Sequence, residues 1–402
     1  MSDTRPFQTD LMNTGVISQD TAKKGNLLLR LIRAAQPISR TEVAARLGID
    51  KSTVTETVKP LISAGILREE GVGEEGKGRR SRVLSFTDDG TYFIGVNLGV
   101  RRSQVGVTTL IDEIGEEEDF ETPSNAGKAI DEARGRIEQF ISERPAGKLK
   151  VIGVSVPGMT DNHRQKLIFA PNLNWRDVDI AKAFNVGNDV KVIVENDATA
   201  AATYEARLKI RNFAEGLLSD FILVRSGTGI GVGIVIGGEV YRGAGSARGV
   251  AGEFGHMTIV AGGKRCVCGN RGCWEKYASA ASAASLYLGD RPLRPGETLP
   301  RFVEIVSKAE NGDIRSRKTL EMIGDYLGIG IANVIMGIGI PRVIISGRLV
   351  YGWRFIEEPM KAAIRRSIIG KIDGWSVEAG EPAGAAIGGA LEVAVEQFLS
   401  TV

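Results

Sequence analysis

Cysteine and histidine are scarce in this sequence, with three cysteines and two histidines among 402 residues. The number of cysteines is odd, and the N-terminal segment has no apolar signal-peptide core. Both observations argue against a secreted protein stabilised by disulfides. Long apolar runs are also missing, because glycine, asparagine or charge interrupts each stretch before the ~18 residues that a membrane span needs. We therefore expect a cytoplasmic protein that does not enter a membrane.

The bulk composition excludes little else. Hydrophobic residues make up 43% of the chain and charged residues 25%, which is typical of a globular protein. The length is too great for one hydrophobic core, so two or three domains are expected. The net charge of +2 does not indicate nucleic-acid binding by itself, so any such signal must be local.

All three cysteines and one histidine fall in a single 18-residue window, at His256, Cys266, Cys268 and Cys273. Three thiols and one imidazole form the tetrahedral ligand set that structural zinc prefers. Glycines between them allow the backbone to turn tightly enough to bring the four side chains together. The alternative, a disulfide with one stray thiol, is disfavoured by the reducing compartment, so the sequence predicts bound zinc.

Three short helices are predicted near the start of the chain. Leucine and isoleucine at helical spacing predict the first over residues 21–35. Ser39 and Glu42 predict a capping box at the start of the second helix, which Gly48 should end. Asp50 is expected to cap the third.

The third helix, KSTVTETVKPLISAG, has apolar residues on one face and small polar residues on the other. A short helix, a tight turn and a polar second helix predict a helix-turn-helix, whose second helix enters the DNA major groove. Pro60 removes one backbone hydrogen bond, but it lies past the turn that would read bases. The candidate DNA contacts on this helix are Lys51, Ser52, Thr53 and Thr55.

Behind these helices, ILREEGVGEEGKGRRSRVLSF predicts two strands joined by a glycine-rich tip, the wing of a winged helix. Basic side chains at this tip suit DNA phosphates or a narrow minor groove; they are Lys77, Arg79, Arg80 and Arg82. A protein-interaction module with a solvated charged loop is the alternative. The combination of a polar second helix with a basic wing favours DNA binding.

From Tyr92 onward, strand-like runs alternate with helices. YFIGVNLGV, SQVGVTTLI, VIGVSVPG and VKVIVEN predict strands, and residues 128–143 predict a helix. A second block starts at FILVRSGTGIG, and its long apolar helix TLEMIGDYLGIGIANVIMGI leads into the strand PRVIISG. The chain ends on the small-residue helix AGAAIGGALEVAVEQFL. This order indicates two layered α/β lobes.

The segment SGTGIGVG is similar to a dinucleotide-binding fingerprint, but that motif needs a helix after its glycines. Here a strand-like run follows, so a Rossmann site is disfavoured. The turn at Gly227, Thr228 and Gly229 has two interpretations, an anion-binding nest of backbone N–H groups or a plain tight hairpin.

These motifs together resemble the ROK family, which comprises bacterial sugar kinases and sugar-responsive repressors. The resemblance covers residues 26–398 and is most specific in GEFGH...CVCGNRGCWE; VPGMTD, PNLNW, ENDATAAATYE, SGTGIG and YRGAGSARGVAGEFGH also match. It implies an α/β fold of two actin-like, ribonuclease-H-like lobes behind a winged helix-turn-helix domain. The expected domains are 1–85 for the DNA-binding head, 86–196 with 386–402 for the first lobe, and 197–385 for the second.

The resemblance also implies a sugar site in the cleft between the lobes, built from Asn172, Asn196, Asp197, Glu253, His256 and Glu275. Carboxylates accept hydrogen bonds from hydroxyls, and asparagine both donates and accepts, which suits a polyol. His256 is expected to bind zinc through one nitrogen and to face the sugar with the other. In the kinases, the residue matching Asp197 is the general base.

The elements that match the kinases' phosphate loops are altered. The first loop has the form Asp-x-Gly-Gly-Thr in the kinases, whereas this chain has Asn97, Gly99, Val100 and Arg101 there. A second Gly-Gly element is changed to Ser346-Gly347-Arg348. We therefore interpret Asn97, Gly99, Gly227, Thr228 and Gly229 as degenerate phosphate loops, which favours sensing over phosphoryl transfer.

Three functions stay open at this point. The favoured one is a sugar-responsive transcription regulator that binds operator DNA as a homodimer or homotetramer and contains zinc. The alternative is an ATP-dependent sugar kinase with an added DNA-binding head, in which Asp197 is catalytic. A third is a structural zinc scaffold for protein contacts, which predicts no response to sugars.

Overall fold

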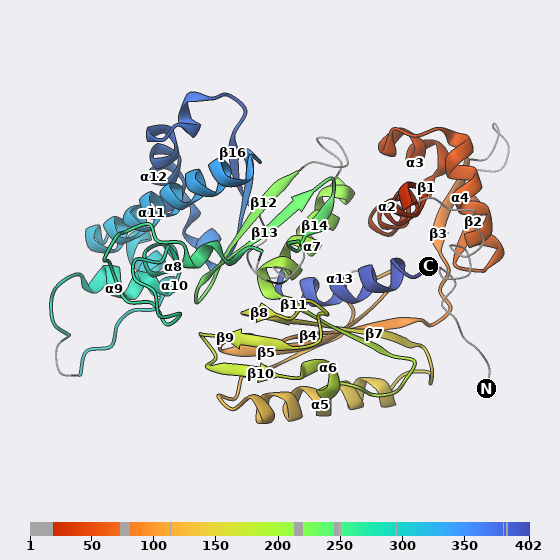
Figure 1. The fold of residues 1–402 in the computed structure, drawn as a ribbon, viewed down its shortest axis with the longest axis horizontal. Coiled ribbons are helices and arrows are strands. Elements are labelled where there is room, and N and C mark those ends of the chain that lie inside the picture. Colours follow the sequence, from red (N-terminus) through yellow and green to blue (C-terminus); the bar gives the residue numbers. More distant parts are fainter. Residues whose placement is uncertain are drawn as a thin grey trace.

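The computed structural model divides into a small N-terminal head and two lobes, each built on a five-stranded sheet (Figure 1). The head lies beside the end of the C-terminal helix, and the two lobes lie to one side of it. The residues that the structure describes are 19–72, 81–112, 114–212, 220–244, 249, 251–293, 296–380, 382 and 385–402.

In its described residues, the head contains three helices and a three-stranded antiparallel sheet in the order β1-β3-β2. Its elements are α2 (Gln19–Ala35), β1 (Ile38–Ser39), α3 (Arg40–Leu47), α4 (Lys51–Ser63), β2 (Leu67–Val72) and β3 (Ser81–Phe86). The two longer strands form the predicted wing, and α3 and α4 form the predicted helix-turn-helix. This is the expected winged arrangement.

The helix caps in the head follow the prediction in part. Ser39 Oγ accepts a hydrogen bond from the Glu42 backbone N–H at 3.1 Å, and Gly48 ends α3 in the left-handed conformation at φ 63°. The Glu42 carboxylate pairs with Arg46 one turn on, so the capping box is only half formed. Asp50 occupies the N-cap position of α4, but its exposed side chain makes no cap hydrogen bond, so that prediction was wrong.

The head shares a hydrophobic core with the first lobe. Leu28, Ile32 and Phe86 pack in one buried cluster with Phe93 of the first sheet and Leu399 of the C-terminal helix. Hydrogen bonds from Arg33 to the carbonyls of Thr109 and Asp112, at 3.0 and 2.8 Å, add to the contact. The head is therefore packed directly against the first lobe.

The first lobe contains a five-stranded sheet in the order β11-β7-β4-β5-β6, parallel across β11, β7 and β4 and antiparallel from β4 to β6. Its strands are β4 (Tyr92–Asn97), β5 (Arg102–Thr109), β6 (Glu117–Glu121), β7 (Leu149–Val156) and β11 (Lys191–Asn196). Helices α5 (Ala126–Ser142) and α13 (Ala385–Leu399) cover opposite faces (Figure 1). A small sheet and a short helix lie at one end, formed by β8 (Met159–Thr160), β9 (Leu167–Ala170), β10 (Trp175–Val178) and α6 (Ile180–Ala183).

The second lobe repeats this plan with the strand order β14-β13-β12-β15-β16. Its strands are β12 (Phe221–Ser226), β13 (Ile230–Ile236), β14 (Glu239–Tyr241), β15 (Arg342–Gly347) and β16 (Ser376–Ala379). Its helices and 3-10 turns are η2 (Glu253–His256), α8 (Glu275–Ala278), α9 (Ser282–Leu288), α10 (Phe302–Glu310), α11 (Ile314–Ile338), η3 (Arg348–Gly352), α12 (Trp353–Arg366) and η4 (Ile369–Lys371).

Two helices, α13 and α7 (Asp197–Asn212), pack against each other between the sheets. Small residues make this contact close: a Cβ on Gly389 would lie 2.7 Å from the carbonyl carbon of Ala200. Arg207 and Glu392 form a buried ion pair across the same contact at 3.2 Å. The small residues of the C-terminal helix thus allow it to pack closely on α7.

Among the described residues, α11 is the one helix whose length and apolar composition would suffice to cross a membrane. Half of its most apolar window is buried inside the protein. A Cβ on Gly328 would lie 2.2 Å from the carbonyl oxygen of Met360 in α12, and one on Gly330 would overlap Trp274. This helix therefore packs in the core of the second lobe.

Candidate functional site

A cleft of about 450 Å³ lies between the lobes, and every residue of the predicted sugar set lines it. They come from four separate segments: Asn172, Asn196 with Asp197, Glu253 with His256, and Glu275. The residues interpreted as degenerate phosphate loops line the same cleft; they are Asn97, Gly99, Gly227, Thr228 and Gly229. The fold thus brings together side chains that lie far apart in the sequence.

Asn196 has a structural task at this site that the sequence analysis missed. Its Oδ1 accepts hydrogen bonds from the backbone N–H groups of Ala198 and Thr199, at 2.8 and 3.2 Å, which caps α7. Its Nδ2 donates to the carbonyl of Gly158 at 3.0 Å. One amide hydrogen is left to contact a ligand.

Asp197, the next residue, is held by Arg225 of β12. One guanidinium nitrogen of Arg225 contacts Asp197 Oδ2 in a close ion pair, and both side chains are about one-fifth exposed. The guanidinium therefore competes with a ligand hydroxyl for Oδ2, one of the two carboxylate oxygens of Asp197. This pair was not predicted, although a lone arginine next to a glycine-rich turn in an apolar strand was a usable signal.

Glu253, His256 and Glu275 form an acidic end of the cleft. His256 Nε2 lies 3.8 Å from Glu253 Oε2, and His256 Nδ1 lies 3.8 Å from Glu275 Oε1. Burial raises the pKa of Glu253 to about 7, and the nearby carboxylates of Asp197 and Glu275 act in the same direction. A carboxyl group in this condition is able to donate as well as accept a hydrogen bond from a hydroxyl.

The turn at Gly227–Gly229 joins two antiparallel strands, β12 and β13. A strand therefore follows the glycines, and the rejection of a Rossmann fingerprint is confirmed. A Cβ on Gly229 would lie 2.4 Å from Glu275 Oε2 and 3.2 Å from Asn172 Nδ2. Glycine at this position lets the turn approach the acidic end of the cleft.

Asn97, at the position of the kinases' acid, is tied into neutral hydrogen bonds. Its Nδ2 donates to Gln104 Oε1 at 3.2 Å, and its Oδ1 accepts from Ser155 Oγ at 3.3 Å. The side chain is buried at 5% exposure. Asn97 itself therefore offers a cation no carboxylate, and its amide is already engaged by Gln104 and Ser155.

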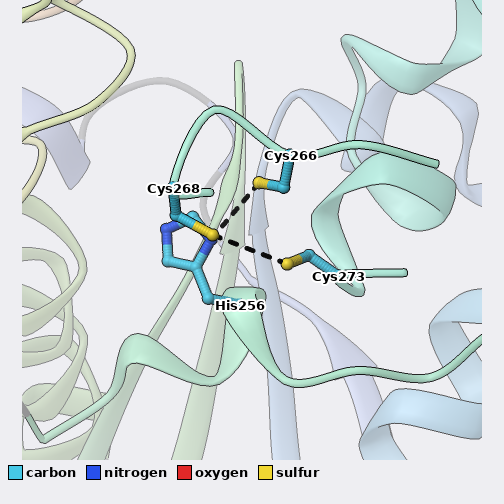
Figure 2. Close-up of side chains that lie close together, drawn as sticks. All are labelled: His256, Cys266, Cys268 and Cys273. Carbon is cyan, nitrogen blue, oxygen red and sulfur yellow. Dashed lines mark hydrogen bonds between the residues drawn. The ribbon is translucent and has the colours of Figure 1, made fainter. Parts of the chain in front are cut away.

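The histidine and three cysteines predicted to bind zinc do lie together (Figure 2). Their ligand atoms are all within 4.8 Å of one another. Around a tetrahedral zinc ion, two sulfurs should be about 3.8 Å apart, and a sulfur and a nitrogen about 3.6 Å apart. The distances are 3.7 Å between the sulfurs of Cys268 and Cys273 and 3.6 Å from Cys266 Sγ to His256 Nδ1. A His/Cys₃ cluster able to hold a metal ion is therefore present.

The chemistry of these thiols also fits a cation. Burial raises the pKa of Cys266 and of Cys273, so their thiolates need a positive charge nearby. The sulfurs of Cys268 and Cys273 are too far apart for a disulfide, whose bond is about 2.05 Å long. The loop depends on glycine, since a Cβ on Gly272 would overlap the carbonyl oxygen of Val260.

The cluster is joined to the acidic end of the cleft. Cys266 Sγ lies 3.1 Å from Glu275 Oε1, and His256 is on the same 3-10 turn as Glu253. His256 directs Nδ1 towards Cys266 and Nε2 towards Glu253. One imidazole therefore lies between the metal-binding cluster and Glu253 of the acidic end.

The candidate DNA-binding surface lies on the head. Lys51 and Ser52 are exposed at the start of α4, and Thr53 and Thr55 are half-buried beside them. In the wing, Arg82 is exposed and pairs with Glu69 at 3.4 Å. The other predicted wing contacts, Lys77, Arg79 and Arg80, lie outside the described residues.

Family models match both parts of the chain: the ROK family model matches residues 93–396, and a winged helix-turn-helix DNA-binding model matches residues 26–68. The chain is 32% identical to the xylose repressor of Bacillus subtilis (strain 168) over 362 residues, which cover 89% of this chain and 91% of that protein. It is 28% identical to the DNA-binding transcriptional dual regulator NagC of Escherichia coli (strain K12), covering 80% of this chain and 79% of that regulator.

Solved structures agree on the fold. A ROK family transcriptional regulator, a homologue of the Escherichia coli MLC protein, superposes with a TM-score of 0.74 at 23% identity and covers 96% of this chain and 98% of its own. A ROK glucokinase from Streptomyces griseus, solved with glucose and AMPPNP, has a TM-score of 0.62 at 28% identity. That kinase is matched over 99% of its length but covers 76% of this chain.

Proposed function

The chain belongs to the ROK family, and from this premise we propose that it is a sugar-responsive, DNA-binding transcription repressor with a structural zinc ion. The observation that carries the proposal is the state of the cleft. The residues proposed to bind a polyol all line it, while Asp197 pairs with Arg225 and the amide of Asn97 is engaged by Gln104 and Ser155. This chemistry suits binding a sugar more than phosphorylating one.

In this proposal the units 1–85, 86–196 with 386–402, and 197–385 act as the DNA-binding head and the two sugar-binding lobes. The head reads operator DNA in the cytoplasm through α4 in the major groove and through the basic wing. Two heads bind a palindromic operator, so the repressor is a homodimer or homotetramer. The winged helix-turn-helix match and the names of the relatives support this assignment.

Zinc is the proposed metal because three thiols and one imidazole, the ligand set that structural zinc prefers, lie within 4.8 Å of one another. His256 and the three cysteines would hold it. Zinc would fix the imidazole of His256 and the loops that carry Glu253 and Glu275. It would supply structure at this site, because the four protein ligands would complete its preferred coordination.

A chain of ion pairs offers a route from the sugar site to the head. Glu195, directly before Asn196, is buried and contacts Arg242 at 2.6 Å. Arg242 contacts Glu396 of α13 at 3.6 Å, and Glu396 contacts Arg30 of α2 at 2.8 Å. Burial opposes the charge on Arg242, but Glu195 and Glu396 outweigh it and raise its pKa. We propose that sugar binding alters this network of ion pairs and thereby changes the position of the DNA-binding head relative to the lobes.

The test is DNA binding with and without sugar. The full-length protein should bind the DNA upstream of its own coding region in a fluorescence anisotropy assay, and one monosaccharide in a panel should change the affinity by about fivefold or more. A matched DNA of shuffled sequence is the control, at one fixed salt concentration. If no upstream segment is bound more tightly than the shuffled DNA, the repressor proposal is wrong.

The repressor and the kinase alternative differ in whether the protein should convert ATP to ADP when a sugar is present. We expect no sugar-dependent release of ADP above the rate in an Asp197→Asn variant, because Asn97 offers no carboxylate for the metal of ATP and Arg225 competes for one oxygen of Asp197. A coupled ADP assay with the same sugar panel measures this. Sugar-dependent ADP release that is lost in Asp197→Asn would favour the kinase, and an unchanged melting temperature with every sugar would favour the scaffold.

A further inference from the structure

Four arginines line the cleft beyond Asp197. Arg102 pairs with Asp119, which also lines the cleft, and the other three come from separate elements. Arg101 lies in the loop between β4 and β5, Arg225 near the end of β12, and Arg348 at the start of η3. Strands β12 and β15 are parallel neighbours in which Arg225 is opposite Ser346, two residues before Arg348. The fold therefore gathers three guanidinium groups at one end of the cleft.

Within the part of the chain that the structure describes, carboxylates balance this positive charge only in part. Arg225 pairs with Asp197, but Arg101 and Arg348 have no acidic side chain within salt-bridge distance among those residues. Their neighbour Arg102 differs, since it pairs with Asp119. Desolvation lowers the pKa of Arg348, and repulsion from Arg101 and Arg225 lowers it further, so the arginines are close enough to disfavour one another's charge.

The two ends of the cleft thus carry side chains of opposite charge. Glu253 and Glu275 form its acidic end, which suits hydroxyl groups, and Arg101 and Arg348 form its basic end, which suits an anion. The ion pair of Arg225 with Asp197 lies where the two ends meet. A ligand that satisfies both ends carries hydroxyl groups on one part and a negative charge on the other.

We propose that Arg101, Arg225 and Arg348 form an anion subsite that receives the phosphoryl group of a phosphorylated monosaccharide. Guanidinium groups donate paired, charge-assisted hydrogen bonds that match the oxygens of a phosphate. The sugar ring lies at the acidic end and the phosphate at the basic end. This inference rests on the proposed function, because it names the class of effector that the sugar site takes.

A nucleotide is the main competing occupant. Arg101, Thr228 and Arg348 also border a second cavity of about 390 Å³. The remainder of that cavity is largely apolar and has room for a flat base; its lining includes Ala280, Ala281, Ala284, Leu299 and Phe302. A nucleoside triphosphate would bring a metal ion, and the hydrogen-bonded Asn97 amide offers that ion no carboxylate. A sugar phosphate needs no such metal and is therefore favoured.

The experiment is calorimetric titration of the full-length protein with glucose, N-acetylglucosamine and xylose, each compared with its phosphate ester (the 6-phosphates of the first two and the 1-phosphate of xylose). At least one ester should bind about tenfold or more tightly than its parent sugar, because two charge-assisted contacts are added. Inorganic phosphate alone and ATP alone should each bind more weakly than that ester.

The double variant Arg101→Gln/Arg348→Gln should lose this preference and keep the affinity for the parent sugar within about twofold. Both side chains are exposed at the cleft, so the fold should be retained, which the melting temperature checks. Arg102→Gln, next in sequence and already paired with Asp119, should leave the preference unchanged.

Equal affinity for parent sugars and esters in the unaltered protein would overturn the inference, as would a preference that survives in the double variant. Phosphate or ATP binding as tightly as any ester would overturn it too, by indicating a free-anion or nucleotide site. These titrations contain no DNA. A neutral sugar that changes DNA binding, with no preference for its ester, would therefore leave the proposed function standing and reject the anion subsite alone.

Discussion

Replacing Cys268 with serine should remove the bound zinc and lower sugar affinity by about tenfold or more. A structural zinc ion stabilises its loop by about 10 kcal/mol or more in small zinc-binding domains, and one lost thiolate removes much of that. The cluster is in contact with the acidic end of the cleft, since Cys266 Sγ lies 3.1 Å from Glu275 and His256 is in the same turn as Glu253. Metal analysis, thermal unfolding and a sugar titration measure the three consequences.

Val267→Ala is the matched control for this prediction. Val267 lies between two of the cysteines in the same loop, is 56% exposed and has no ligand atom. It should leave zinc content at one ion per chain and sugar affinity unchanged. A metal-free Cys268→Ser protein that binds sugar with normal affinity would show that the cluster and the cleft are independent.

The second large effect should come from Arg30 in the head. An Arg30→Met variant should bind operator and sugar nearly as the unaltered protein does, but the sugar should no longer change DNA affinity by more than about twofold. Arg30 is 9% exposed and makes its ion pair with Glu396 at 2.8 Å. Methionine keeps the apolar stem packed, and Glu396 retains Arg242, so no carboxylate is left without a partner.

Anisotropy titrations of operator DNA with and without saturating sugar measure this response. Arg354→Met, an exposed arginine on α12 far along the chain from the head, is the control and should respond as the unaltered protein does. A full sugar response in Arg30→Met would exclude the ion-pair chain as the route between the cleft and the head. Loss of sugar binding itself would contradict it as well, because Arg30 does not line the cleft of the candidate sugar site.

Much of the local structure was predictable from residue patterns. Strands β4, β5, β7, β11 and β15 occur where apolar runs predicted them, as do helices α5, α11 and α13. The small sheet of β8, β9 and β10 was not predicted, because its short strands have no clear alternation of apolar and polar residues. Asp50 shows the limit of cap prediction, since a residue suited to capping stays solvated when water competes for its carboxylate.

The candidate site was predictable to different degrees. The metal-binding cluster could be predicted from the sequence alone, because closely spaced thiols in a chain otherwise free of cysteine are typical of a metal site. The cleft residues needed the family resemblance, since Asn172 and Glu275 are ordinary residue types that carry no signal by themselves. The ion pair of Arg225 with Asp197 was missed, because a separation of 28 residues has no preferred geometry until two strands and a helix meet.

By itself, the sequence determined the classes of structure and chemistry present: a winged head, α/β lobes and a histidine–cysteine cluster. These depend on short-range periodicity, on turn residues and on the rarity of a residue type, all of which are properties of neighbouring positions. Only the tertiary structure decided that the head shares its core with the first lobe, that Arg30 connects to Glu195, and that three arginines meet in the cleft. Such contacts arise from the packing of separate elements, and no local pattern encodes which elements meet.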